Sequence, residues 1–339
     1  MGSLTINENK HPTLDLHCHL RGTITPGHAT ELAQKHAITL PKSVAGDGYA
    51  FSGFDNFLTL YDQVGHVVRS AQDLHEIAYR YLRKVAKQGT CYVEFMISPG
   101  HSIANGIDFG SQISALSDAL DIAQAEFGVF GCIIVTCVRH RGSEEAVNVA
   151  ELASRVNNRY LRGFGLTGNE HKFDVEDFVG AFAVAQSSGL ELTAHVGEWS
   201  PAAEVTNAVN KLNLKRVGHG ISVAAEPSIM AELAERKTGF EICLSSNVQL
   251  GASRCYETHP VRQLLNAGCK VALSTDDPAY FDTTPFRELS LATQCLDLTS
   301  NQIDGITADS IEMAFCDEST KQALRQKINS LYQRTSPKS

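Results

Sequence analysis

The chain has 339 residues, 43% of them hydrophobic and 20% charged, which is the composition of an ordinary soluble globular protein with a substantial core. The net charge of −9 comes from 29 basic and 38 acidic residues without long runs of one sign, and this disfavours nucleic acid as a partner because nucleic-acid binding needs clustered Lys and Arg. No window approaches the roughly 20 apolar residues of a membrane helix, and the first residues are polar, so we expect no membrane partner and a cytoplasmic protein that acts on a small molecule.

Short apolar or β-branched runs alternate with stretches of helical periodicity, and this alternation predicts strand–helix units. Eight runs are expected to be strands: Thr13–His19, Cys91–Ile97, Gly131–Val138, Leu161–Leu166, Leu190–His195, Arg216–His219, Phe240–Leu244 and Lys270–Ser274. Helices are expected between and after them: Ala71–Gln88, Phe109–Phe127, Ser143–Asn157, Val175–Ser188, Ala203–Leu212, Pro227–Arg236, Pro260–Ala267, Ile306–Phe315 and Glu318–Arg334.

Eight such units predict a (β/α)8 barrel of the TIM type, since these barrels take about 250 residues. An open, doubly wound sheet is the alternative that strand boundaries alone leave open. The remaining length predicts extra structure between the first two strands, over residues 20–89, and closing helices at the C-terminus. We expect one domain over residues 1–339, with residues 1–12 and 335–339 as flexible tails; the oligomeric state stays open.

Polar residues cluster at the ends of the predicted strands, where barrel enzymes form their active sites. His17 and His19 close the first run, and a spacing of two points both rings to the same face of a strand. His195 ends the fifth run, and Asp276 follows the eighth. Histidine nitrogen and carboxylate oxygen are common zinc ligands, so these four residues predict one Zn²⁺ per chain. The nine cysteines form no Cys-x-x-Cys pair, so we expect no cysteine metal site.

Three further side chains follow a predicted ligand or end another predicted strand. Glu198 follows the third ligand closely enough to take a proton from a zinc-activated water and deliver it to a substrate, although a surface-loop acid is the alternative. His219 lies between two glycines and is interpreted as a group that orients this water, as another ligand or as a core histidine. Asp277 adjoins Asp276, and a metal on Asp276 would free Asp277 for hydrogen bonding.

These motifs, taken in order, resemble the adenosine deaminase family of the amidohydrolase superfamily. The matching segments are Leu14–Leu20, Gly165–Glu170, His195–Glu198, Gly218–Gly220, Ser245–Asn247 and Ser274–Pro278. The resemblance implies a zinc-dependent hydrolase that deaminates an aminopurine nucleoside, either adenosine or a 5′-modified adenosine. Adenine and N6-substituted adenine compounds are alternative substrates. A hydrolase of another bond, such as an ester, and a binding protein without catalysis are the competing hypotheses.

The resemblance also implies a role for each matched residue. His17, His19, His195 and Asp276 become the metal ligands, with His19 also bordering the substrate. Glu198 becomes the proton shuttle that contacts purine N1, and His219 holds the attacking water. Asp277 is expected to hydrogen-bond purine N7, and the backbone of Gly168 to meet N3.

Arg21 departs from the family pattern, in which an acidic residue usually contacts the 5′ end of the ribose. A guanidinium suits bidentate hydrogen bonds to a carboxylate or phosphate, so one hypothesis is an anionic group on the substrate. The other is that Arg21 pairs with a loop carboxylate and that the substrate is plain adenosine. The segment 49–58 resembles the apolar lid of the family, with Phe51 and Phe54 on the substrate, or is simply a helix packed on the barrel.

Overall fold

A computed structural model describes residues 11–46 and 48–335, and its centre is a parallel sheet of eight strands. The strands, in their order around the sheet, are β1 (Thr13–His19), β4 (Thr90–Ile97), β5 (Phe130–Val138), β6 (Leu161–Thr167), β7 (Glu191–Val196), β8 (Arg216–His219), β9 (Gly239–Ile242) and β10 (Lys270–Leu273). A parallel bridge between Cys18 and Asp276 joins the first strand to the segment after the last. The predicted (β/α)8 barrel is therefore confirmed.

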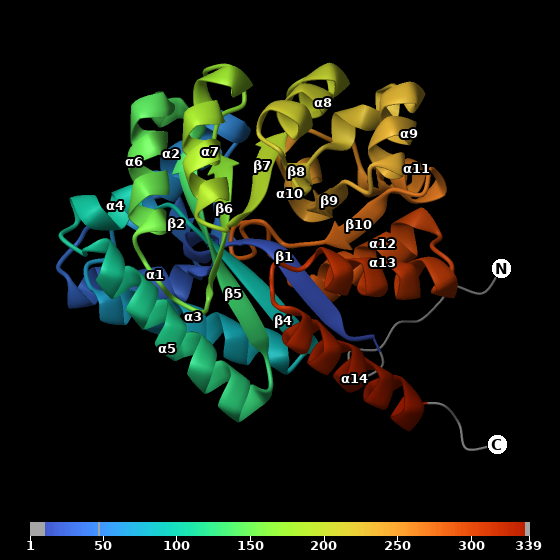
Figure 1. The fold of residues 1–339 in the computed structure, drawn as a ribbon. Coiled ribbons are helices and arrows are strands. Elements are labelled where there is room, and N and C mark those ends of the chain that lie inside the picture. Colours follow the sequence, from blue (N-terminus) through green and yellow to red (C-terminus); the bar gives the residue numbers. More distant parts are fainter. Residues whose placement is uncertain (1–10, 47, 336–339) are drawn as a thin grey trace.

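Helices follow the strands and surround them (Figure 1). The barrel helices are α3 (Ala71–Ala86), α5 (Phe109–Phe127), α6 (Gly142–Ser154), α7 (Val179–Ser187), α8 (Ala202–Lys211), α9 (Pro227–Glu235), α11 (Val261–Asn266) and α13 (Ser300–Met313). The helix α5 shows why these segments are helical, since the side chain of Asp108 caps its first turn and Gly128 ends it in the left-handed conformation. Its Ile113, Leu116 and Leu120 are buried at helical spacing and face the core.

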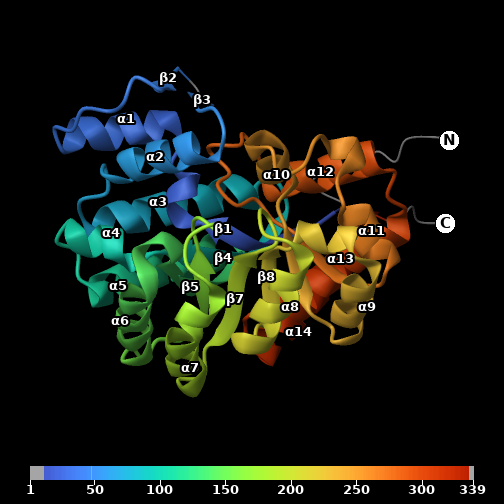
Figure 2. The same cartoon turned by 90° about the horizontal axis from the view of Figure 1, so that it is seen from above.

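Additional elements lie between β1 and β4 and gather on one side of the barrel (Figure 2). They are η1 (Leu20–Thr23), α1 (Pro26–Lys35), the antiparallel pair β2 (Val44–Ala45) and β3 (Gly48–Tyr49), and α2 (Phe54–Gly65). Shorter elements follow later strands: α4 (Pro99–Ala104), η2 (Arg139–Arg141), η3 (Val175–Phe178), η4 (Ile221–Ala225), α10 (Leu244–Leu250) and η5 (Tyr256–Thr258). The helices α12 (Pro285–Leu296) and α14 (Glu318–Thr335) complete the C-terminal part. No helix within residues 11–46 and 48–335 is long and apolar enough to cross a membrane.

Several boundaries differ from the sequence prediction, and the largest shift is in α13, which begins at Ser300 although the sequence predicts this helix from Ile306. The strand predicted over Phe240–Leu244 ends at Ile242, and Leu244 begins α10. This helix buries polar and apolar residues alike, so its sequence lacks the amphipathic period that marks a helix. The prediction also misses α12, which begins with the Thr284 cap and Pro285. Thr335 ends α14 instead of starting a tail, and the other predicted tail residues, except 11 and 12, lie outside the described residues.

Candidate active site

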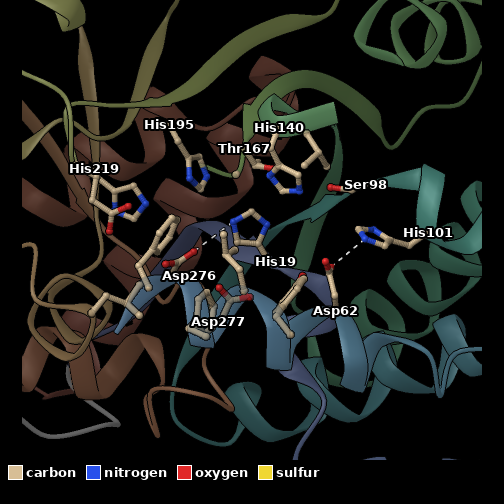
Figure 3. Close-up of a pocket in the computed structure, with 18 residues that line it drawn as sticks. His19, Asp62, Ser98, His101, His140, Thr167, His195, His219, Asp276 and Asp277 are labelled. Carbon is tan, nitrogen blue, oxygen red and sulfur yellow. Dashed lines mark ion pairs between the residues drawn. The ribbon is translucent and has the colours of Figure 1, made fainter. Parts of the chain in front are cut away.

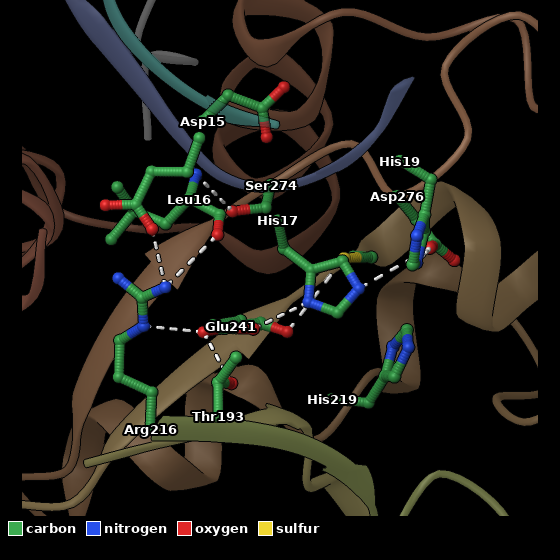
Figure 4. Close-up of polar contacts among 12 residues, drawn as sticks. Asp15, Leu16, His17, His19, Thr193, Arg216, His219, Glu241, Ser274 and Asp276 are labelled. Carbon is green, nitrogen blue, oxygen red and sulfur yellow. Dashed lines mark hydrogen bonds and ion pairs between the residues drawn. The ribbon is translucent and has the colours of Figure 1, made fainter. Parts of the chain in front are cut away.

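The four predicted ligands meet at the carboxyl end of the strands (Figures 3 and 4). The ring centroid of His17 lies 5.2 Å from that of His19 and 4.6 Å from that of His195. The Oδ1 atom of Asp276 lies 3.5 Å from Nε2 of His17 and 3.2 Å from Nε2 of His19. Closure of the barrel produces part of this geometry, because the backbone N–H of Asp276 donates to the carbonyl of His17 at 2.8 Å and the N–H of His19 donates to the carbonyl of Asp276 at 2.8 Å.

Two ring nitrogen atoms at the centre of this group form no hydrogen bond, and this fits a metal ion. The Nε2 atoms of His17 and His195 are buried without a hydrogen-bond partner, which costs free energy unless another group binds them. One ligand atom from each of His17, His19 and His195 lies within 4.8 Å of the other two. Three imidazoles and a carboxylate are a donor set that zinc prefers.

The buried carboxylate of Glu241 orients His17, the first predicted ligand (Figure 4). Nδ1 of His17 lies 2.6 Å from Oε2 of Glu241, while Nε of Arg216 and the hydroxyl of Thr193 donate to Oε1 at 2.6 and 2.9 Å. Burial opposes the negative charge of Glu241, but Arg216 and His17 outweigh it and lower the pKa of this carboxyl to about 2. An ionised Glu241 accepts a hydrogen bond from the Nδ1–H group of His17, which keeps the proton on Nδ1 and leaves Nε2 for a metal.

The same network extends to the chain that follows α13. The Arg216 guanidinium donates to Oε2 of Glu94 at 2.6 Å and to the carbonyl of Met313 at 2.9 Å. It lies over the ring of Phe315 at 3.5 Å from the centroid, and the backbone N–H of Phe315 donates to Oε1 of Glu94 at 2.6 Å. Arg216 is only 1% exposed, so its charge depends on these partners.

We expect Glu241→Gln to weaken Zn²⁺ binding by about 10- to 100-fold, because outer partners of a metal-bound histidine typically contribute this much. The amide keeps the size of the side chain but removes the charge that holds the His17 proton on Nδ1. Arg216 keeps its ion pair with Glu94 in this variant. Competition with a chromophoric chelator measures the affinity, with the exposed Glu176→Gln as the control. Equal affinities for both variants would show that Glu241 does not orient this ligand.

A second carboxylate holds the loop that carries Glu198. Glu170 accepts hydrogen bonds from the backbone N–H groups of Gly197, Glu198 and Ser200 at 2.9, 3.0 and 3.0 Å. Burial, together with the charges of Asp276 and Glu170, raises the pKa of Glu198 well above its usual range. Glu198 is therefore a buried acid in a fixed position, which favours the proton-shuttle interpretation over that of a surface-loop residue.

His219 and Asp276 share an unusual backbone conformation. Their φ angles are 63° and 61°, in the left-handed region where non-glycine residues are strained and often serve a site. Next to His219, a Cβ atom on Gly218 would lie 2.9 Å from Cε1 of His17 and 3.1 Å from Cδ2 of His195. The glycine before His219 therefore allows the three rings to meet, as the sequence predicts.

Asp277 lies beside this group with one unused oxygen. Its Oδ1 atom is buried without a hydrogen-bond partner. A Cβ atom on Gly22 would lie 2.1 Å from this oxygen, so only glycine at that position admits the carboxylate. The structure thus places Asp277 next to Asp276 with an oxygen available to a ligand.

A cavity of about 70 Å³ opens beside these residues. Seven of the residues that line it lie at or beside the strand ends: His19, Gly168, His195, Glu198, His219, Asp276 and Asp277. The helix α2 contributes five more: Phe54, Phe57, Leu58, Tyr61 and Asp62. Figure 3 shows His19, His195 and Asp276, three of the predicted ligands, at one end and Ser98, His101 and Asp62 at the other. Phe54 lines the cavity as predicted, whereas Phe51 packs against Phe57 with centroids 5.4 Å apart. The helix α2 is therefore both packed on the barrel and one wall of the cavity.

Arg21 lines a small neighbouring cavity of about 20 Å³ that shares His19, Tyr61, Ser98 and His101 with the first. The side chain is only 8% exposed, and its sole hydrogen bond to the part of the chain that the structure describes is a long one to Oγ of Ser102 at 3.5 Å. The nearby Asp62 pairs with His101 at 3.0 Å instead. Among residues 11–46 and 48–335, no carboxylate forms an ion pair with Arg21, which disfavours the loop-carboxylate hypothesis.

Sequence reasoning assigns no role to three residues that support this site, namely Glu170, Asn247 and Glu241. Glu170 and Asn247 lie within segments that match the adenosine deaminase family, and this position was the signal that could have assigned them to the site. Their contacts, however, involve backbone N–H groups and distant side chains that no local pattern reveals.

Comparison with known proteins decides the family. The model of the adenosine deaminase family matches residues 12–331. The chain belongs to the adenosine deaminase family. Its relatives include adenine deaminases of Rhizobium leguminosarum bv. trifolii, 34% identical over 92% of this chain and 97% of the relative, and of Chelativorans sp., 33% identical over 91% and 95%.

Solved structures agree with this membership of the adenosine deaminase family. The adenine deaminase from Arthrobacter aurescens superposes with a TM-score of 0.88 at 26% identity, covering 95% of this chain and 99% of that one. An amidohydrolase from Burkholderia ambifaria, crystallised with zinc, has the same fold, with a TM-score of 0.87 at 24% identity over 98% and 96% of the two chains. The predicted resemblance is confirmed, and the enzyme is a hydrolytic deaminase of C–N bonds.

Proposed function

We propose that this deaminase uses one zinc ion to convert a 6-aminopurine compound into the 6-oxopurine and ammonia. The observation that carries the proposal is the convergence of His17, His19, His195 and Asp276 with Glu198 beside one cavity. The two orphaned Nε2 atoms support a metal at that place, and the donor set supports zinc.

Zinc, when bound, supplies a hydroxide at neutral pH by lowering the pKa of water to about 7. We assign the first proton that this water loses to Glu198, which would deliver it to purine N1. The second proton, still on the added oxygen, would then pass to the amino group that leaves. The oxygen forms its bond to C6, and the C6–N bond then breaks to release ammonia. His219 would hold the attacking water, while Asp277 and the backbone of Gly168 would hydrogen-bond purine N7 and N3.

Two substrates have separate support. The similar curated relatives are named adenine deaminases, which favours adenine. The cavity around Arg21 favours an adenosine that carries a carboxylate or phosphate beyond the sugar, because an unpaired buried guanidinium needs an anionic partner. Plain adenosine fits the metal site equally well but gives Arg21 no partner.

A panel of adenine, adenosine, N6-methyladenosine, AMP and adenosine-5′-carboxylate tests the proposal, with ultraviolet absorbance and ammonia release as the measurements. Ammonia from at least one compound, dependent on zinc, is the expected result. Release of acid from an ester without ammonia from any purine would instead establish a different hydrolase. The absence of any turnover by the zinc-loaded protein would favour a binding protein.

We expect Arg21→Met to lower kcat/KM for the anionic compounds by about 10- to 100-fold, the usual scale of a hydrogen bond to a charged group. Methionine fills a similar volume without the charge, so adenine and adenosine should keep their kcat/KM within about threefold. Arg69→Met, which changes an exposed arginine, is the control. Equal losses on neutral and anionic compounds would refute an anion-binding role for Arg21.

A further inference from the structure

A buried chain of hydrogen bonds runs from His259 through Asn247 to the catalytic acid. His259 follows η5, is 2% exposed and does not line the cavity. Its Nε2 atom lies 3.2 Å from Oδ1 of Asn247, a fully buried residue of α10. The Nδ2 atom of Asn247 lies 3.1 Å from Oε1 of Glu198 and 3.2 Å from Nδ1 of His219.

One backbone contact fixes the direction of this chain. The N–H of Val261 donates to Nδ1 of His259 at 3.2 Å, so that nitrogen accepts and the neutral ring carries its proton on Nε2. Burial lowers the pKa of His259 to about 3, which keeps the ring neutral at physiological pH. A protonated Nε2 only donates, so Asn247 must present its oxygen to His259 and its N–H₂ group to Glu198.

The orientation of an asparagine amide otherwise has two nearly equivalent states related by a flip. In the flipped state Oδ1 of Asn247 would face Oε1 of Glu198, and the proton of the acid would be drawn to that oxygen. In the observed state Oε1 accepts from Nδ2, and Oε2 is the oxygen that carries the transferred proton. The same amide donates to Nδ1 of His219, which places the proton of a neutral His219 ring on Nε2.

We propose that His259 is a positioning residue for deamination, because it fixes the Asn247 amide and so decides which oxygen of Glu198 transfers the proton. The inference rests on the proposed function of Glu198. The proton leaves the attacking water for Oε2 and leaves Oε2 for the purine, so Glu198 returns to its starting state after each turnover. Among the described residues, His259 forms no hydrogen bond with a predicted metal ligand, and it does not line the cavity.

Two substitutions at one position test the proposal. His259→Leu removes the donor and should lower kcat by about 100-fold, the scale of a displaced catalytic group, while KM changes by no more than about threefold. His259→Gln offers a side-chain N–H to Asn247 and should recover kcat to within about tenfold of the unchanged protein. Both variants should retain one zinc per chain. Equal kcat values for the leucine variant and the unchanged protein, or equal losses with leucine and glutamine, would overturn the proposal.

A double-mutant cycle separates positioning from general damage. Asn247→Ala should lower kcat, and adding His259→Leu should then lower it no further, because the group that His259 orients is gone. Additive losses would show that His259 acts by another route. Asn247→Asp provides a second test if the leucine variant does not fold, since aspartate has the same size but no N–H for Glu198 and should lose kcat at constant zinc content.

The nitrogen resonances of His259 test the inference without any turnover. In the zinc-loaded protein they should show a neutral ring with its proton on Nε2 between pH 5 and 8, a range well above the pKa of about 3. A ring with its proton on Nδ1 would overturn the inference even if the enzyme deaminates purines. Failure of every aminopurine as a substrate, with the expected tautomer present, would instead refute the proposed function.

Discussion

Glu198→Gln is expected to end ammonia release while the protein keeps its zinc. General acid–base groups typically contribute about 10²- to 10⁴-fold to a rate, and Glu198 is placed in both proton transfers, so we expect a loss at the upper end of this range. Glutamine has nearly the same shape and can still meet Nδ2 of Asn247 with its oxygen. It lacks, however, an oxygen that takes up a proton.

The measurement is steady-state ammonia release together with the zinc content of the purified variant. Glu176→Gln, an exposed change of the same kind, serves as the control and should leave both unchanged. A Glu198→Gln variant with more than about a tenth of the original kcat would remove Glu198 from the mechanism, because such a small loss is below the range for a general acid or base. Loss of zinc would show instead that Glu198 is a ligand.

Removal of the metal is expected to have the second large effect. A catalytic zinc stabilises the transition state by several kcal/mol, so chelation should lower kcat by about 10³-fold or more. Added Zn²⁺ should restore the activity of the unchanged protein. His195→Ala should lose the metal and stay inactive after the addition, because its Nε2 is one of the unpartnered atoms at the centre of the site.

His66→Ala is the matched control, since His66 is exposed and lies at the end of α2. Zinc content by elemental analysis and ammonia release by a coupled assay give the two readouts. Full activity in the zinc-free protein would contradict a metal-dependent mechanism. Full zinc content in His195→Ala would remove His195 from the ligand set.

The sequence predicts those parts of the molecule whose signals are local. The strands Thr13–His19 and Arg216–His219 have the predicted boundaries. Both are short and end at a histidine. The histidines at their ends become neighbours through the closure of a parallel barrel, which brings all carboxyl ends of the strands to one face. Strand count and strand-end chemistry together were therefore enough to predict the cluster.

The remaining features depend on tertiary contacts that no short segment records. In the sequence, Arg216 is only the first residue of a short predicted strand. The structure buries its charge between Glu94 and Glu241. The function of Asn247 depends on His259, twelve residues further along, and on a donated backbone N–H. Arg21 is informative only because no carboxylate among the described residues forms an ion pair with it, and a sequence does not show such pairing.

The contacts of Arg216 with Met313 and Phe315 also bear on the order in which the protein matures during synthesis. The ribosome adds about 5–20 residues per second, and a domain generally folds as a unit. His17 and His19 emerge first, but the guanidinium that anchors Glu241 beneath His17 gains its last partners only when residues 313–315 arrive. The contacts that hold Glu241 next to His17 are therefore complete only after residues 313–315 have been synthesised, when all eight strands of the barrel are available.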